Sequence, residues 1–175
     1  MNVVPDIDVL GRHDCTPLYG ASWSKHFEIV QWLLSHGANP NNRSKFDGRT
    51  PLHGAAYFGQ VEACRILLQY KADICALDNK GQTPLHVAVH YDEVNVARLL
   101  LEHGADVNAP DNRHNTPLVA AVNDRNVSRS VEMTRLLVEH GADIDAEGSD
   151  GKTAFQVASE RGFEITEFLS KYSSK

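Results

Sequence analysis

A short motif recurs along the chain at an almost constant spacing, and it constrains the fold more than any other feature. Thr50-Pro51-Leu52-His53 returns 33 residues later as Thr83-Pro84-Leu85-His86. Thr16-Pro17-Leu18 precedes the first of these by 34 residues, Thr116-Pro117-Leu118 follows the second by 33, and Thr153-Ala154-Phe155 comes after a further 37. Self-similarity at this period indicates a repeat protein, in which each unit packs mainly on its neighbours.

Each copy of the motif marks the start of a helix. Threonine suits the N-cap, because its hydroxyl accepts a hydrogen bond from a free backbone amide. Proline suits the first helical position, where no hydrogen-bonded amide is lost. A second helix follows in every unit, and its apolar positions have helical spacing, as Ile29, Trp32 and Leu33 do in the first unit. Each unit is therefore predicted to form a helix-turn-helix.

Small residues recur at fixed positions around these helices. Alanine occupies one position of the first helix in all five units, which predicts close contact between neighbouring helices (Ala21, Ala55, Ala88, Ala121 and Ala158). Gly37, Gly104 and Gly141 follow the second helix, where a left-handed residue usually ends a helix. Lys71 takes this place in the second unit, and a left-handed conformation there would cost roughly 1–2 kcal/mol.

The Thr-Pro-Leu-His motif, followed after one residue by alanine and repeated every 33 residues, resembles the ankyrin repeat. The resemblance covers nearly the whole chain and implies an α-class fold, an ankyrin-repeat solenoid of stacked helix-turn-helix units joined by β-hairpin-like loops. We expect a single array over residues 1–175, with repeats at about 11–43, 44–77, 78–110, 111–147 and 148–175. Residues 1–10 match the tail of a preceding repeat, so either the array continues upstream or this segment forms its edge.

Composition argues against several classes of function. The chain has 17 Lys and Arg against 23 Asp and Glu, a net charge of −6, and no basic run of the kind that binds nucleic acid. No apolar run approaches the ~18 residues of a membrane span, and the start of the chain lacks the pattern of a signal peptide. Three cysteines without metal-type spacing indicate neither a disulfide framework nor a zinc site. We expect an intracellular monomer, cytoplasmic or nuclear, that binds neither nucleic acid nor membrane.

No residue pattern indicates catalysis or a cofactor. Of the nine histidines, His53 and His86 belong to the helix-start motif, and three others precede the glycines that end the second helices (His36, His103 and His140). The sequence has no phosphate-binding loop, nucleophile elbow or paired carboxylates. Cys15 beside His13 is the nearest approach to a nucleophile and its base. We therefore expect no enzyme activity, no cofactor and no bound metal.

The resemblance implies binding to a protein partner, because ankyrin arrays present their loop tips and first helices as a concave surface. Two residues of each unit are expected to line this surface. They are aromatic over three units and polar afterwards: Trp23-Ser24, Tyr57-Phe58, His90-Tyr91, Asn123-Asp124 and Glu160-Arg161. Aromatic side chains are enriched at the energetic centres of protein interfaces, so this aromatic stripe predicts a contact surface. The alternative is that the rings only fill gaps between stacked repeats.

Phe46 is a second candidate anchor, because it lies at a loop tip where the other units carry polar residues. Arg12, His13, Lys80 and Arg113 are expected to form a polar, partly basic rim above it. The predicted partner-binding residues are therefore Trp23, Phe46, Tyr57, Phe58, His90, Tyr91, Arg12, Lys80, Arg113, Asn123 and Asp124. The alternative function is a regulatory or spacer segment of a larger multidomain protein, docking on its own chain.

Asn41 and Asn108 occupy equivalent positions in two loops. From the residues alone, their side chains are expected to bond the backbone of the turn. The resemblance identifies the position as one that can be hydroxylated in animal ankyrin repeats, and the sequence leaves both roles open.

Overall fold

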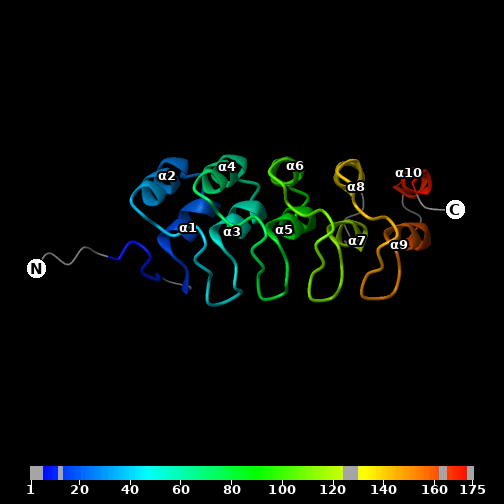
Figure 1. The fold of residues 1–175 in the computed structure, drawn as a ribbon, viewed down its shortest axis with the longest axis horizontal. Coiled ribbons are helices and arrows are strands. Elements are labelled where there is room, and N and C mark those ends of the chain that lie inside the picture. Colours follow the sequence, from blue (N-terminus) through cyan, green and yellow to red (C-terminus); the bar gives the residue numbers. More distant parts are fainter. Residues whose placement is uncertain (1–5, 12–13, 124–129, 162–164, 173–175) are drawn as a thin grey trace, which may run out of the picture.

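The computed structural model is a single stack of two rows of short helices with a row of loops along one side (Figure 1). It describes residues 6–11, 14–123, 130–161 and 165–172. The inner row, next to the loops, consists of α1 (Pro17–Trp23), α3 (Pro51–Tyr57), α5 (Pro84–His90), α7 (Pro117–Asn123) and α9 (Ala154–Arg161). The outer row consists of α2 (Phe27–Ser35), α4 (Val61–Gln69), α6 (Val94–Glu102), α8 (Ser130–Glu139) and α10 (Ile165–Ser170). Within the described ranges there is no strand, only an isolated bridge between Glu147 and Thr153, and the fold is the predicted α-helical solenoid.

The core runs through the stack as a line rather than as a central cluster. Each inner helix packs on the inner helices beside it and on the outer helix of its own unit. The motif leucines are fully buried (Leu18, Leu52, Leu85 and Leu118), and the recurring alanines are buried in all five units, as close helix contact requires. Cys64, on the outer row, is also fully buried.

The outer helix of the first unit differs from the predicted pattern. Trp32 is 55% exposed and Ile29 is also exposed, whereas Ile66, at the position in α4 that corresponds to Trp32, is 7% exposed. The helical spacing of apolar residues therefore does not correspond to a buried face at these two positions. The physical reason is that their side of α2 faces the end of the stack, where no further helix of the described chain packs. Trp32 is partly covered by the ring of His36, with ring centroids 4.1 Å apart.

The loops are tied to one another by side-chain bonds to backbone. Asn41 Oδ1 accepts a hydrogen bond from the Asp73 amide at 2.7 Å, and Asn108 Oδ1 accepts one from the Asp143 amide at the same distance. Each asparagine also donates from Nδ2 to a backbone carbonyl of the next unit. Asp8 makes the equivalent bond in the preceding loop, where its carboxylate accepts from the Asn39 amide. These side chains bond backbone as expected, but in the neighbouring loop rather than in their own.

A buried histidine joins each of the two central units to the next. The Nδ1 atom of His53 accepts from the Thr50 amide at 3.2 Å, so the ring proton lies on Nε2, which contacts the Gln82 carbonyl at 2.9 Å. His86 repeats the arrangement, with Nδ1 on the Thr83 amide and Nε2 3.1 Å from the Asn115 carbonyl. Burial lowers the pKa of His53 to about 4 and lowers that of His86 as well. Both rings are therefore neutral near pH 7.

The left-handed helix ends occur where they are predicted. Gly37, Gly104 and Gly141 have φ between +85° and +91°, and Lys71 has φ +66°. Lys71 is exposed, so its side chain gains little from packing that would offset the unfavourable backbone conformation.

Replacing Lys71 with glycine should therefore stabilise the protein by roughly 1 kcal/mol, equivalent to a rise of about 2–4 °C in melting temperature. Thermal unfolding followed by circular dichroism measures this shift. Lys80→Gly is the matched control, because Lys80 also lies in a loop but does not have a positive φ. An unchanged or lower melting temperature for Lys71→Gly would contradict the assignment.

The buried histidines should make stability depend on pH. An unfolded histidine has a pKa of about 6.5, so below that pH the unfolded chain binds protons that the folded state excludes. The stabilisation that comes from keeping these histidines neutral is fully present above pH 6.5 and is lost as the pH falls toward 4. For His53, the free energy of unfolding should fall by roughly 1–2 kcal/mol between pH 7 and pH 5.

The test is urea unfolding at pH 7 and pH 5 of the unaltered protein and of His53→Gln/His86→Gln. Glutamine preserves the cap, since Gln156 accepts from the Thr153 amide in the fifth unit, but it does not titrate. The double variant should lose less stability at pH 5, whereas His103→Gln, an exposed control, should behave like the unaltered protein. Equal losses in all three proteins would contradict the prediction.

Candidate functional site

Aromatic rings of α1, α3 and α5 form a continuous ladder across the first three units. The ring of Trp23 contacts that of Phe58, with centroids 5.8 Å apart, and Phe58 and Tyr57 are 4.5 Å apart. Tyr57 then contacts Tyr91 at 4.0 Å. Tyr19 and His90 extend the ladder at its two ends, at 5.6 Å from Trp23 and 4.8 Å from Tyr91. We call these six residues the aromatic ladder.

The rings of the ladder are exposed at some positions, half-buried at others and buried at Tyr19. Trp23 is 39% exposed, Phe58 is 47% exposed and His90 is exposed, as predicted for a contact surface. Tyr57 and Tyr91 are instead half-buried and packed against the core, so they face outward only in part. Their rings contact each other between adjacent units, and the Arg49 guanidinium lies 5.5 Å from the Tyr57 ring centroid. These two tyrosines therefore fill the gap between repeats, as the alternative interpretation requires.

A cleft of about 400 Å³ opens between the start of the ladder and the second loop. Tyr19 and Trp23 line it from α1, and Phe46 lines it from the loop tip. Asp14, Cys15, Ser44 and Asp47 complete the lining. We call this cleft the aromatic slot. Phe46 is 87% exposed, which agrees with its predicted position at a tip.

The environment of the slot disfavours negative charge. Burial raises the pKa of Tyr19 to about 12, with a further contribution from the charge of Asp47. Burial also raises the pKa of the Cys15 thiol, with smaller contributions from the charges of Asp14 and Asp47. A raised pKa reduces the thiolate fraction, so Cys15 is poorly suited to act as a nucleophile. Its suggested base, His13, lies outside the described residues.

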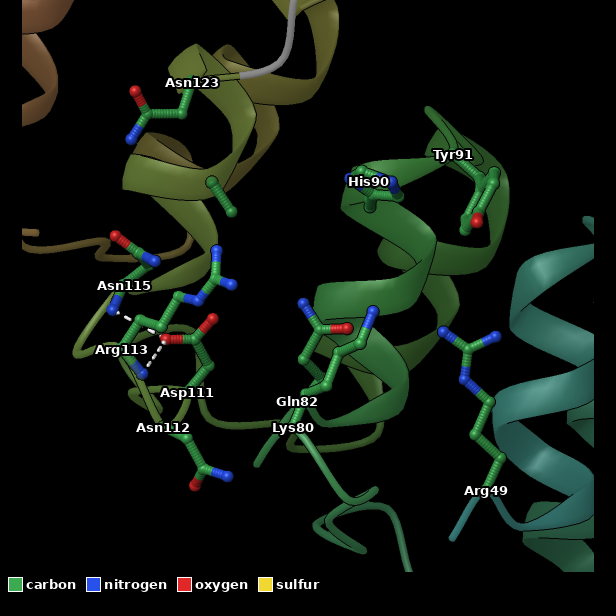
Figure 2. Close-up of a pocket in the computed structure, with 11 residues that line it drawn as sticks. Arg49, Lys80, Gln82, His90, Tyr91, Asp111, Asn112, Arg113, Asn115 and Asn123 are labelled. Carbon is green, nitrogen blue, oxygen red and sulfur yellow. Dashed lines mark hydrogen bonds between the residues drawn. The ribbon is translucent and has the colours of Figure 1, made fainter. Parts of the chain in front are cut away.

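A second cleft, of about 470 Å³, lies further along the same side of the stack (Figure 2). Lys80, Gln82, Asp111, Asn112 and Arg113 line it from the loops, and Figure 2 shows His90, Tyr91 and Asn123 at the ends of the helices facing them. Arg49 and Asn115 are among its remaining lining residues. We call this cleft the polar pocket.

The loops of the polar pocket are held in shape by turn carboxylates. Asp111 Oδ1 accepts from the amides of Arg113 and Asn115, at 2.8 and 2.9 Å (Figure 2). Asp78 accepts in the same way from the Lys80 and Gln82 amides. Among the residues that the structure describes, no ion pair involves the side chain of Lys80 or Arg113. Both cations are exposed, so the pocket presents positive charge on rigid loops.

The predicted site residues thus separate into two groups. Trp23 and Phe46 line the aromatic slot, whereas Lys80, Arg113, His90, Tyr91 and Asn123 line the polar pocket. Lys80 and Arg113, predicted to form a basic rim above Phe46, are not among the residues that line the slot beside it. Arg12 and Asp124 lie outside the described residues.

Sequence reasoning missed the residues that complete the two clefts. Tyr19 occupies the position that His53 and His86 hold in later units, and this exchange is visible in the sequence. Asp14 and Asp47 border the slot, and Arg49 and Asn115 border the pocket. These residues lie close to the motif in the sequence, and only the packing of adjacent loops shows that they meet.

The described residues contain no group of three or more histidine, cysteine, aspartate or glutamate side chains placed to hold a metal ion. None of the described helices combines the length and the apolar character needed to cross a bilayer.

Comparison with known proteins gives matches over most of the chain. Residues 18–111 match a family profile described as ankyrin repeats in three copies, and residues 113–149 match a profile of the single ankyrin repeat. These profiles describe modules that generally mediate protein–protein interactions and are generally non-catalytic.

Several proteins share a segment of similar sequence with this chain. The putative ankyrin repeat protein FPV024 of Fowlpox virus (strain NVSL) is 28% identical over 46% of this chain and 14% of its own length. Protein phosphatase 1 regulatory subunit 12A of Mus musculus is 36% identical over 38% of this chain and 6% of its own length. Ankyrin repeat and SOCS box protein 5 of Homo sapiens is 39% identical over 41% of this chain and 21% of its own length. The match thus spans 6–21% of the length of these relatives.

The packing of the ladder and the slot predicts different roles for two of their rings. Tyr57→Ala should lower the free energy of unfolding by roughly 1–3 kcal/mol, because the ring packs on the core and on Tyr91. Phe46→Ala should change it by less than about 0.5 kcal/mol, since the side chain is almost wholly exposed. Urea unfolding of the two variants measures both effects, and a Phe46→Ala loss as large as that of Tyr57→Ala would contradict this division.

Proposed function

Because the chain belongs to the ankyrin repeat family, we propose that it is a non-catalytic protein-interaction module that binds a protein partner through its concave surface. This surface consists of the inner helices and the loop tips. The observation that carries the proposal is the position of Phe46, Trp23 and Phe58. All three are large apolar side chains with exposed area on the same side of the stack.

Exposed aromatic rings are the residue type that contributes most to protein interfaces when they become buried. The half-buried tyrosines of the ladder support this use by fixing the exposed rings from behind: Tyr57 contacts Phe58 and Tyr91. The loops opposite are fixed by turn carboxylates at Asp78 and Asp111. A surface held rigid before binding loses less conformational entropy when a partner docks.

The polar pocket adds charge to the same surface. Lys80 and Arg113 lie on an otherwise acidic chain of net charge −6. Local positive charge of this kind contributes to the orientation and the rate of association with an acidic partner. We propose that Lys80, Arg113, His90, Tyr91, Asn123, and the flanking Arg12 and Asp124, contribute to the partner-binding face.

A second candidate function is a regulatory or spacer segment that docks on another region of its own polypeptide. The observation that favours it is the small share of its relatives that this chain matches, between 6% and 21% of their length. One of those relatives is named as a regulatory subunit of a phosphatase. The surface involved would be the same, and only the source of the bound segment would differ.

We also propose that the protein is an intracellular monomer. Its three cysteines all lie in the described residues and form no disulfide with one another, and one of them, Cys75, is exposed. Cysteines that are not joined in disulfides are typical of a reducing compartment.

The proposal is tested by panning the intact protein against a phage library of random 16-residue peptides. Fluorescence polarisation then gives the affinity of each selected peptide. Trp23→Ala/Phe58→Ala should weaken binding at least about tenfold, the loss expected when interface aromatics are truncated. Glu62→Ala/Glu102→Ala changes exposed residues of the outer row and should leave affinity unchanged. Thermal unfolding checks that both double variants are folded.

Two results would contradict the proposal. One is a failure to select any peptide that competes for the inner surface. The other is selected peptides that bind Trp23→Ala/Phe58→Ala, in its folded form, as tightly as they bind the unaltered protein.

A further inference from the structure

We infer that the aromatic slot receives a cationic side chain, a lysine or an arginine, from the bound protein partner. This inference rests on the proposed function and names the chemistry of one anchor on the partner. Three observations carry it: the three aromatic walls of the slot, the two carboxylates at its edge, and the placement of basic residues elsewhere on the same surface.

The walls of the slot are aromatic and come from two elements. Tyr19 and Trp23 lie one helical turn apart on α1, and their rings meet edge to face at 5.6 Å. Phe46 lines the slot from the loop, and within the described chain its ring stacks on no other ring. The faces of such rings attract a cation placed within about 6 Å.

The loop that carries Phe46 is held in place although its side chain is exposed. The Phe46 amide donates to Ser44 Oγ at 3.2 Å, and the Ser44 amide donates to the Arg49 carbonyl at 2.8 Å. The Lys45 amide donates to the Asp14 carbonyl, which ties this loop to the preceding one. The third wall is therefore positioned before any partner arrives.

The edge of the slot is acidic. Asp14 and Asp47 line it, and no lysine or arginine is among the lining residues that the structure describes. Asp47 lies 3.6 Å from Arg49 Nε, but the same nitrogen is 3.4 Å from the buried carboxylate of Asp78. One guanidinium is thus shared between two carboxylates, so the slot retains negative charge.

The ionisation of neighbouring groups agrees with this geometry. The charges of Asp14 and Asp47 both add to the raised pKa of the Cys15 thiol, after the larger effect of burial. Asp47 acts on the pKa of Tyr19 in the same sense. The contribution of the two carboxylates to these pKa shifts favours a positive group in the same space, whereas burial opposes charge of either sign.

A purely apolar anchor would suit the slot less well. It would remove water from the two carboxylates without replacing their hydrogen bonds, and unpaired buried charge is costly. A lysine or arginine can lay its methylene stem on the exposed rings of Trp23 and Phe46 and keep its charged head beside the carboxylates. The polar pocket, lined by Lys80 and Arg113, would repel the same cation. A lysine or arginine of the partner should therefore bind in the aromatic slot, at the α1 end of the surface, and not in the polar pocket.

The experiment uses one peptide from the panning and a set of analogues in which each lysine or arginine in turn is replaced by norleucine. Norleucine keeps the stem and removes the charge. We expect selected peptides to be enriched in lysine or arginine at one position, and norleucine there to weaken binding by about tenfold.

The slot itself is tested with Asp14→Asn. Asparagine tolerates a positive φ as aspartate does, and Asp14 has φ +54°, so the fold should not change. Asp14→Asn should weaken the basic peptide by several-fold and leave the norleucine analogue unaffected. Glu102→Gln removes the same charge from an exposed site on the outer row and is the matched control. Phe46→Ala should also weaken the basic peptide, without loss of stability.

Two other results would distinguish failure of the cation inference from failure of the proposed function. If the peptides require Trp23 and Phe58, but norleucine and Asp14→Asn make no difference to affinity, the cation inference is overturned and the proposed function stands. If no selected peptide requires Trp23 and Phe58, both are overturned.

Discussion

The geometry of this protein depends on the bond that a buried histidine makes between one unit and the next. His53 and His86 each accept from an amide at their own helix start, and each contacts a carbonyl of the following loop. One ring therefore fixes both the start of an inner helix and the distance to its neighbour. The position of the following loop depends on this distance, and so does the polar pocket, which lies between the two units that His86 joins. Because both ring nitrogens are engaged, a proton added to Nδ1 would face the amide hydrogen of Thr50 or Thr83.

The first unit departs from this arrangement, and the departure creates the aromatic slot. Tyr19 stands where the histidine would stand, and its ring packs beside Gly54 of the next unit. A Cβ at Gly54 would lie 3.5 Å from the Tyr19 ring, so the larger valine found at the equivalent position, Val87, would extend into it. The glycine gives room for the tyrosine, and the tyrosine begins the ladder. In this unit the histidine bond to the following loop is therefore absent, and the ring of Tyr19 lines the aromatic slot instead.

Much of this fold could be predicted because the signals are local. The caps at Thr16 and Thr83, the left-handed Lys71 and the buried alanines each depend on a few adjacent residues and on the repeat period. The orientation of Tyr57 and Tyr91 could not be predicted in this way. Each ring packs on the ring in the adjacent unit, and the motif contains no information about that pairing. The exposure of Trp32 could not be predicted for a similar reason, because it depends on whether another helix packs beside α2 and not on the residues of α2 itself.

The residue at the loop tip differs between Phe46 of the second unit and the units that follow it. The equivalent residues of the next two units are Asn79 and Asn112, and Asn112 Nδ2 donates to the Asn79 carbonyl at 3.2 Å, joining tip to tip. Phenylalanine cannot make such a bond, so the second loop lacks a link that an asparagine could supply. In exchange it exposes a large apolar ring to water, which adds nothing to folding and raises the tendency to associate. A side chain that lacks this bond and packs little on the described residues supports the proposed contact with a partner. The rigid backbone beneath Phe46 holds the ring ready for that contact.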